Sequence, residues 1–291
     1  MEKETKKKHT LLKIILVIMF ILIIIVLYSR FLATRGLDVK EYKITNEIIA
    51  DSFYGFKIVH ISDIHYGRTV NKSELENLVN EINLLKPDIV VLTGDLIDKD
   101  TEMNETKSKE ISDILSQINA SVGSYAISGN HDKYFSQWEN IIKDSGFKNI
   151  NNTYELIYNK GYAPILLAGI SSNSEDNLNI NEKYAPIEEY INSSEEFNDI
   201  YKILLMHEPD FIDDINYSYF NLVLAGHSHN GQIRLPLIGA TILPPNGKKY
   251  YNEYYKLNNT DLYVSSGVGT STISFRLFNK PSINFYRLTN K

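Results

Sequence analysis

The sequence has 291 residues, of which 43% are hydrophobic and 23% are charged. These values are typical of globular domains, so they exclude a disordered chain and a collagen-like chain. The chain has no cysteine, which excludes disulfide scaffolds, thiolate zinc sites and cysteine nucleophiles.

The first element along the chain is a long apolar run. Every residue from Ile14 to Tyr28 is apolar, and residues 11–29 are interrupted by a single charge, Lys13. A helix of this length, at about 1.5 Å per residue, approaches the roughly 30 Å hydrocarbon core of a bilayer. A cleaved signal peptide is the alternative, but the run is long and no small-x-small cleavage site follows it. We therefore predict a basic tail at 1–10, a transmembrane anchor at 11–29 and a connector at 30–50.

Charge is distributed unevenly around this run. Residues 1–35 carry a net charge of +5, and the remainder of the chain carries −11. The basic residues Lys3, Lys6, Lys7, Lys8 and Lys13 precede or enter the run, whereas only Arg30 and Arg35 follow it closely. The positive-inside rule therefore predicts a single-pass protein of the cell membrane, with its N-terminus in the cytoplasm and its C-terminal domain outside. Because an acidic body binds phosphate backbones poorly, we do not expect nucleic acid as the main partner.

Apolar strands and amphipathic helices alternate in the predicted domain, residues 51–291. The predicted strands are Lys57–Ser62, Asp88–Thr93, Ser124–Ser128, Pro164–Ile170, Tyr201–Met206 and Phe220–Ala225. The predicted helices are Ser73–Leu85 with Ser73 and Glu76 as its capping pair, Lys107–Ile118, Trp138–Asp144, and one near Ile187–Ile191 within the polar loop 171–199. Shorter β segments follow residue 231, including 261–265 and 282–287. This alternation predicts an α/β fold with a largely parallel sheet that is buried on both faces.

Side chains able to bind metals follow five of these strands. In chain order they are Asp63, His65, Asp95, Asp98, Asn130, His131, Asp132, His207, His227 and His229. Each motif alone is weak, since Asp-x-His is more often a turn and a lone histidine is more often a core residue. Ligands of open α/β sheets bind outside the carboxyl ends of the strands, so these groups should converge. Burying so many carboxylates and imidazoles without a cation would cost several kcal/mol per unpaired charge.

The same residues carry a family resemblance. The chain resembles the five blocks of the calcineurin-like metallophosphoesterases through Asp63-x-His65, Gly94-Asp95-x-x-Asp98, Gly129-Asn130-His131-Asp132, His207 and Gly226-His227-x-His229. The match covers about residues 56–230. A closing segment, Gly267–Thr270 and Arg276-x-Phe278-Asn279-x-Pro281, resembles the membrane-anchored bacterial branch of that family. The resemblance implies a four-layer α/β/β/α sandwich behind the transmembrane helix.

The resemblance also implies two divalent transition-metal ions, Mn, Fe or Zn, in keeping with nitrogen and oxygen ligands and no sulfur. The first ion would be held by Asp63, His65 and His229; the second by Asn130, His207 and His227; and Asp95 would bridge them. His131, oriented by Asp98, would protonate the leaving group or stabilise the phosphoryl charge. Asp132 could share this orienting role, or it could simply stabilise its turn.

These observations predict a membrane-anchored phosphoesterase that hydrolyses a phosphate monoester, diester or pyrophosphate with water activated by two metals. The anchor makes lipid-linked or cell-envelope phosphoesters candidate substrates. The alternative is a catalytically inactive binding protein on the same scaffold, although the complete ligand set argues against it. An intracellular protein phosphatase or nucleotidase is disfavoured by the span and the charge bias. The apolar segment Ile233–Pro245 is either a β-hairpin packed on the second sheet or an apolar lip that meets the bilayer or an acyl chain.

Overall fold

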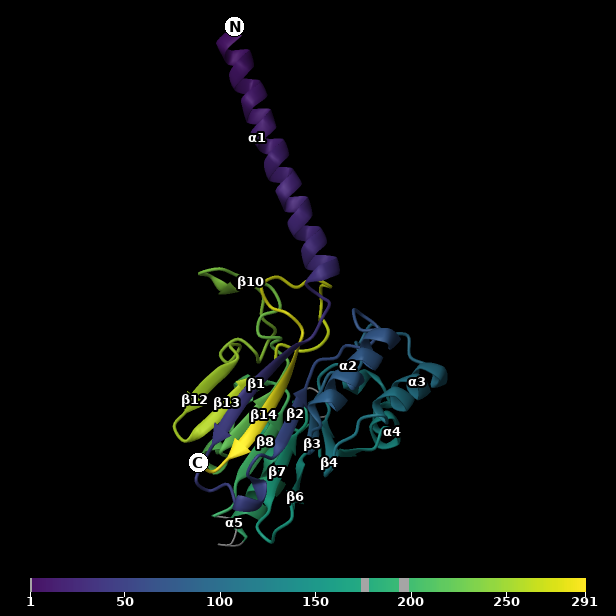
Figure 1. The fold of residues 1–291 in the computed structure, drawn as a ribbon, viewed down its shortest axis with the longest axis vertical. Helices are drawn as coiled ribbons and strands as arrows, with labels where there is room; N and C mark the ends of the chain where they lie inside the picture. The colour runs from purple at the N-terminus through teal and green to yellow at the C-terminus, as the bar shows by residue number, and fades with distance from the viewer. Residues whose placement is uncertain (1, 174–177, 194–198) are drawn as a thin grey trace.

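The computed structural model describes residues 2–173, 178–193 and 199–291 (Figure 1). Its first element is α1 (Glu2–Leu27), which continues into one π-helical turn, η1 (Tyr28–Leu32). The segment Lys6–Leu32 is long and apolar enough to cross a membrane, and α1 projects away from the rest of the molecule with its apolar side chains exposed. The predicted apolar helix is therefore present.

Two six-stranded sheets form the body of the protein. The first has the order β1-β14-β2-β3-β4-β5, and the second has the order β12-β13-β9-β8-β7-β6. The first sheet consists of β1 (Asp38–Thr45), β14 (Ser282–Thr289), β2 (Lys57–Ile61), β3 (Ile89–Thr93), β4 (Gly123–Ile127) and β5 (Phe147–Asn149). The second consists of β12 (Tyr254–Leu257), β13 (Thr260–Val264), β9 (Leu222–Ala225), β8 (Lys202–Met206), β7 (Ile165–Ile170) and β6 (Thr153–Ile157).

Most strand pairs in both sheets are parallel. The antiparallel pairs are β14 with β2 in the first sheet, and β12 with β13 and β6 with β7 in the second. In the first sheet β2, β3, β4 and β5 run parallel, and in the second sheet β7, β8 and β9 do. The carboxyl ends of the parallel strands in each sheet therefore share one edge, as predicted.

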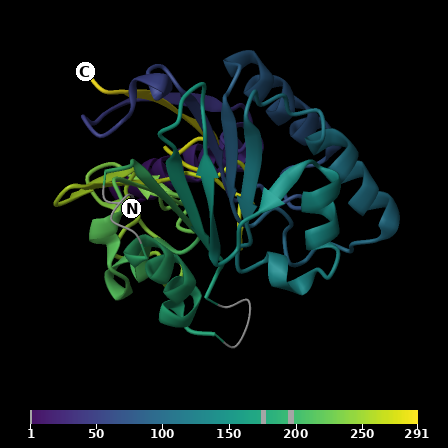
Figure 2. The same ribbon diagram turned by 90° about the horizontal axis from the view of Figure 1, so that it is seen from below.

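Helices cover the outer face of each sheet (Figure 2). The helices are α2 (Lys72–Leu85), α3 (Glu105–Leu115) and α4 (Trp138–Asp144) on the first sheet and α5 (Ile180–Asn192) on the second; short 3-10 turns are η2 (Asp51–Phe53), η3 (Asp132–Tyr134), η5 (Pro209–Asp214) and η6 (Tyr217–Tyr219). In the first sheet, Val90 packs against the helices and its neighbour Val91 packs between the sheets. In the second sheet, Leu204 packs on the helix side and its neighbour Leu205 packs between the sheets. These three buried clusters define the predicted α/β/β/α sandwich.

The predicted connector at 30–50 differs from the structure, because residues 38–45 form β1. This strand pairs with β14 along its whole length, from Asp38 opposite Ser282 to Thr45 opposite Thr289. Its apolar Val39 lies on the exposed face and its charged Lys40 on the half-buried face, which obscured the period-two pattern. Ile44 is buried, and the ring of Tyr42 stacks on that of Tyr286 with centroids 5.2 Å apart. The strand thus belongs to the sheet rather than to a linker.

Three helix starts also differ from the prediction, and α3 starts at Glu105 rather than at Lys107. The capping box of α2 is made by Asn71 and Glu74, not by Ser73 and Glu76, so the helix starts at Lys72. Asparagine is as good an N-cap as serine, and sequence spacing alone did not separate them. Helix α5 spans 13 residues instead of the short segment that was predicted. Parts of the predicted loop around it, 174–177 and 194–198, lie outside the described residues.

The apolar segment after residue 231 forms a small hairpin of its own. Strands β10 (Arg234–Leu235) and β11 (Gly239–Ala240) pair with each other in a separate two-stranded sheet. Leu237 and Ile238 at the tip are exposed. Of the two alternatives for this segment, the structure shows a β-hairpin, but in a sheet of its own and with an exposed apolar tip.

Candidate metal centre

The predicted site residues come together at the carboxyl ends of strands from both sheets. The loops after β2, β3 and β4 contribute from the first sheet, and those after β8 and β9 contribute from the second. The residues brought together are Asp63, His65, Asp95, Asp98, Asn130, His131, His207, His227 and His229. Asn130 and His227 are half-buried and the others are buried.

The predicted ligands fall into two groups that share Asp95. In the first group, His65 Nε2 lies 3.1 Å from His229 Nε2, which lies 3.6 Å from Asp63 Oδ1. In the second, His207 Nε2 lies 3.0 Å from the side-chain oxygen of Asn130, and His227 is close by. Asp95 Oδ2 is 3.5 Å from Nε2 of both His65 and His207. Its carboxylate thus lies between the two groups.

These separations fit the donor geometry of bound metal ions. Nitrogen and oxygen ligands about 2.0–2.2 Å from one ion lie roughly 3.0–3.5 Å from each other. Neighbouring donor atoms in the site are 3.0–3.6 Å apart. Carboxylate oxygens and imidazole nitrogens also form the donor set preferred by divalent transition metals. The residues present therefore fit two such ions.

The backbone at these positions is strained. Asp63, His65, Asp95, His227 and His229 have φ angles of 51°, 46°, 53°, 64° and 48°. Non-glycine residues rarely adopt this left-handed region, and each instance costs of order 1–3 kcal/mol unless the surroundings enforce it. Five of the seven predicted ligands thus have strained backbone, so the fold loses local stability here and orients these side chains toward the site.

Backbone carbonyls orient two of the imidazole rings. His207 donates from Nδ1 to the Thr93 carbonyl over 2.7 Å, which leaves Nε2 facing Asp95. His227 donates from Nε2 to the Pro245 carbonyl over 2.7 Å, which leaves Nδ1 as its free ring nitrogen. A hydrogen bond on one ring nitrogen fixes the tautomer that presents the other to a metal.

The electrostatics of the site favour a cation. Burial raises the pKa of Asp95, but the imidazoles of His207 and His65 outweigh it and lower that pKa below its usual value. Burial lowers the pKa of His207, and the Asp95 carboxylate outweighs this and raises it well above its usual value. The pKa of His229 is well below its usual value because of burial and the neighbouring His65. The Asp95 carboxylate therefore attracts positive charge, which a proton on His207 or a bound cation would supply.

Asp98 lies beside two histidines. Its Oδ2 is 3.3 Å from His65 Nδ1 and 3.6 Å from His131 Nδ1, and it accepts a 2.9 Å hydrogen bond from Arg68 Nε. His131 Nδ1 itself accepts from the Lys99 amide at 3.1 Å, so in the neutral ring the proton is on Nε2. Sequence reasoning missed Arg68, although it follows His65 by only three residues.

Asp132 stabilises the turns around the site. Its carboxylate accepts hydrogen bonds from the amides of Asp95 and Gly129 at 2.8 Å each, and from those of Leu96 and Ile97. A Cβ on Gly129 would lie 2.3 Å from Asp95 Oδ1, so only glycine permits this approach of the two loops. The turn-stabilising interpretation of Asp132 is therefore the one that fits its contacts.

The closing segment supports the first ligand group. Arg276 is fully buried, and its guanidinium donates to the carbonyls of Ser266 at 2.7 Å and Gly267 at 3.0 Å. Burial lowers the pKa of Arg276 to about 9, which leaves it cationic at neutral pH. Asn279 donates to the carbonyl of His229 at 2.7 Å. From the sequence alone, these residues had no predicted role beyond their resemblance to a closing motif.

A cavity of about 420 Å³ opens onto the predicted ligands. Asp95, Asn130, His131, His227 and His229 lie at its polar side. Its other side is largely apolar and includes Ile233, Ile242, Leu243, Pro244, Pro245 and Ile273. The predicted groups thus face a space that could admit a phosphoester with an apolar substituent.

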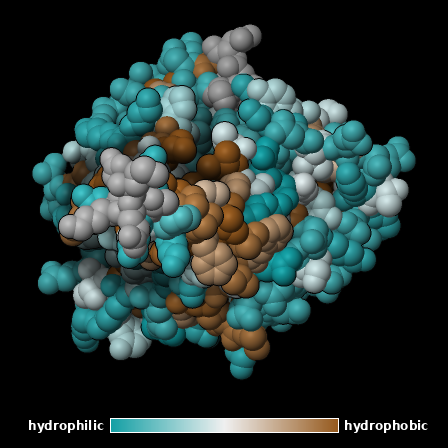
Figure 3. All heavy atoms as spheres, turned by 90° about the horizontal axis from the view of Figure 1, so that it is seen from above, coloured by the Kyte–Doolittle hydropathy of each residue, from teal (hydrophilic) through white to brown (hydrophobic). Residues whose placement is uncertain are grey.

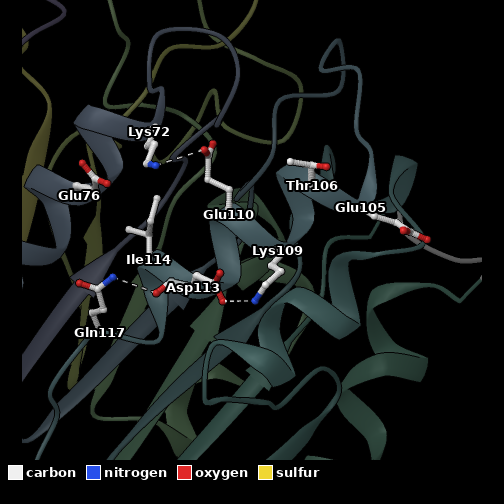
Figure 4. Close-up of a pocket in the computed structure, with 9 residues that line it drawn as sticks. All are labelled: Lys72, Glu76, Glu105, Thr106, Lys109, Glu110, Asp113, Ile114 and Gln117. Carbon is white, nitrogen blue, oxygen red and sulfur yellow. Dashed lines mark hydrogen bonds and ion pairs between the residues drawn. The ribbon is translucent and has the colours of Figure 1, made fainter.

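A larger pocket, about 580 Å³, lies between α2 and α3 (Figure 4). We call it the charged groove; its lining includes Lys72, Glu76, Glu105, Lys109, Glu110 and Asp113. These charges are mostly exposed and pair with each other, as between Lys109 and Asp113 at 2.9 Å. The charged groove holds none of the predicted ligands, so volume alone does not mark the site.

Comparisons with known proteins agree with this geometry. Residues 56–231 match the family model described as calcineurin-like phosphoesterase. The chain is 32% identical over 269 residues to the uncharacterized metallophosphoesterase YkuE of Bacillus subtilis, covering 90% of this chain and 88% of that protein.

Two further relatives are more distant. The chain is 26% identical to the phosphodiesterase YaeI of Escherichia coli, covering 82% of this chain and 84% of that protein. It is 28% identical to a transmembrane protein with metallophosphoesterase domain of Danio rerio, covering 89% of this chain and 59% of that protein. Together with the ligand geometry, these matches establish that the chain belongs to the calcineurin-like phosphoesterase family and is a metal-dependent phosphoric ester hydrolase.

Proposed function

We propose that this protein is a membrane-anchored two-metal phosphoesterase whose ligands are those predicted from the sequence. Asp63, His65 and His229 hold one ion, and Asn130, His207 and His227 hold the other. The observation that carries this proposal is the placement of Asp95 Oδ2 at 3.5 Å from one histidine of each group. A carboxylate in that position can bind two cations at once.

The metals would supply Lewis-acid activation of water and of the phosphoryl group. Mn, Fe and Zn are the candidates, because all the donors are nitrogen or oxygen. The chain's own residues position the substrate and move its proton. His131 lines the cavity, and its imidazolium form, which the Asp98 carboxylate beside Nδ1 stabilises, can give its Nε2 proton to the leaving alkoxide and return to the neutral ring. Lys99 lines the same cavity and adds positive charge near the phosphate.

Metal content and ester turnover test this proposal together. The full-length chain, purified in detergent, should contain about two transition-metal ions and hydrolyse nitrophenyl phosphate monoesters or diesters. Removal of the metals with a chelator should abolish turnover, and Mn, Fe or Zn should restore it. Full turnover by metal-free protein would refute the proposal.

We also propose that the catalytic domain faces the outside of the cell. The support is the bias of basic residues across α1: five lysines between Lys3 and Lys13 precede or enter the apolar run, and only Arg30 and Arg35 follow it closely. Since the chain has no cysteine, single cysteines report topology without background. In intact cells, an impermeant maleimide should label Tyr162→Cys in the domain and leave Thr10→Cys in the tail unlabelled. The reverse pattern would place the domain in the cytoplasm.

A substrate confined to the membrane or cell envelope follows from the short link between anchor and domain. Only residues 33–37 separate η1 from β1, and they can span less than about 20 Å. The site is thus held close to the bilayer, which favours lipid-linked or envelope phosphoesters over soluble nucleotides. Turnover of a vesicle-bound phosphoester at a higher kcat/KM than a soluble nucleotide would support this preference, and the opposite ranking would contradict it.

A further inference from the structure

Apolar side chains gather where α1 meets the domain. Leu235, Leu237 and Ile238 of the hairpin are exposed, as are Leu32 and Phe278. We call these five residues the apolar rim. Seen along α1, apolar side chains gather on this face of the molecule, those of α1 among them (Figure 3). An exposed apolar cluster beside a membrane span indicates contact with lipid.

Hydrogen bonds fix the position of the rim relative to the anchor. The Arg276 amide donates to the Ser29 carbonyl in the last turn of the helix at 3.0 Å. One residue further on, the Leu277 carbonyl accepts from the Arg234 amide of β10 at 2.9 Å. The hairpin is therefore linked through residues 276–277 to the end of the helix, and Figure 1 shows β10 beside that end.

The rim is continuous with the cavity at the metal ligands. Ile233 and Ile242, which flank the hairpin, line the cavity, and so does Ile273. Gln232 holds the two sides of this wall together, because its Nε2 donates to the Ile273 carbonyl at 2.7 Å. An apolar path thus leads from the exposed hairpin tip to the ligands, and one substrate could lie along it with its phosphate at the site.

We propose that the apolar rim inserts into the bilayer surface and that the substrate is a membrane lipid phosphoester whose acyl chain lies on the wall formed by Ile233, Ile242 and Ile273. This inference rests on the proposed function and names its substrate class. The apolar rim contacts lipid rather than a protein, because it is linked by hydrogen bonds to the end of the membrane-spanning helix. It therefore lies at the bilayer surface where that helix emerges. Burial of Leu237 and Ile238 there removes apolar surface from water.

Insertion of the rim is testable without any enzymatic turnover. The absence of native cysteines allows an environment-sensitive fluorophore at Leu237→Cys in the full-length chain. The matched control is Tyr162→Cys, an exposed position in the turn before β7, at the end of that strand away from the site. The probe protein is reconstituted at low density in phosphatidylcholine–phosphatidylglycerol vesicles that contain a lipid with a nitroxide on its acyl chain.

We expect a blue-shifted emission and strong nitroxide quenching at position 237, and a water-like emission with weak quenching at position 162. Equal, weak quenching at both positions would overturn the proposal. A blue shift at 237 without lipid quenching would also overturn it, since the rim would then be covered by protein.

The substrate class is tested by comparing two esters in the same variants. Leu237→Asp should lower turnover of a phospholipid phosphoester in vesicles about tenfold more than turnover of a nitrophenyl ester, because lipid transfer to the site is impaired. Leu84→Asp is the matched control, an exposed leucine at the end of α2 where the chain turns back toward the start of β3. It should leave the ratio of the two turnovers unchanged.

The outcomes separate this inference from the function on which it rests. A ratio that is the same for Leu237→Asp and the unmodified chain would overturn the lipid substrate and leave the phosphoesterase in place. Absence of turnover on both esters in metal-loaded, unmodified protein would instead count against the proposed function. The quenching result would still decide whether the rim inserts.

Discussion

The metal-ligand cavity and the charged groove are both lined by acidic and basic side chains, yet they differ in every other respect. In the charged groove the side chains are mostly exposed and satisfy each other on two regular helices. At the cavity, Asp95, His207 and His229 are buried, and five of the predicted ligands have left-handed backbone. The difference shows that burial and strain, rather than size or the number of charges, distinguish the functional pocket.

Removal of the shared carboxylate should have the largest effect. Asp95→Asn keeps the volume of the side chain but removes the charge that both groups share, so metal content should fall and turnover should drop by at least about 10³-fold. Elemental analysis and nitrophenyl ester kinetics measure the two effects. If Asp95→Asn retained two ions and normal turnover, the bridging role would be wrong.

Replacement of His131 should separate proton transfer from metal binding. His131→Ala should lower kcat by about 10²-fold or more, while metal content stays near that of the unmodified chain. Esters with better leaving groups should suffer less, because they need less protonation. A matching loss of metal would instead make His131 a ligand, as its proximity to His65 and Asp95 would allow.

Asp98→Asn should have an intermediate effect. Its carboxylate lies within 3.6 Å of both His65 and His131, so the substitution disturbs one predicted ligand and the predicted acid without deleting either. Supporting partners of this kind typically contribute 10–100-fold in metal affinity or activity, and we expect a loss of about that size. Metal titration and kcat measured on one preparation would show which histidine depends more on Asp98; normal values for both would remove its supporting role.

A change in the charged groove should have the smallest effect. Asp113→Asn breaks the 2.9 Å ion pair with Lys109, whose side chain is exposed. Exposed pairs contribute little, so kcat, KM and metal content should all stay the same. A substantial loss of turnover would show that the larger pocket takes part in function and that burial and strain alone do not distinguish the functional pocket.

Sequence reasoning was most successful where side chains follow buried strands. Asp63 and His207 lie after β2 and β8, as predicted, because both are buried strands and ligands of such sheets gather at the carboxyl ends of the strands. It failed where structure depends on distant partners. The charged strand β1 is stable only beside β14. The carbonyls that accept hydrogen bonds from Arg276 are brought together only by tertiary packing. Arg68 carries no motif of its own, and only the fold brings it to Asp98.

The position of β14 has a consequence for how the chain folds. This strand, residues 282–289, lies between β1 and β2, two strands that precede it by more than 200 residues. During synthesis, β1 therefore has no neighbour in its sheet until almost the whole domain has emerged. Such long-range pairing is slow to form and leaves strand edges open to aggregation in the meantime. Chaperones that protect unpaired strands should thus bind the nascent chain until residue 289 has been added.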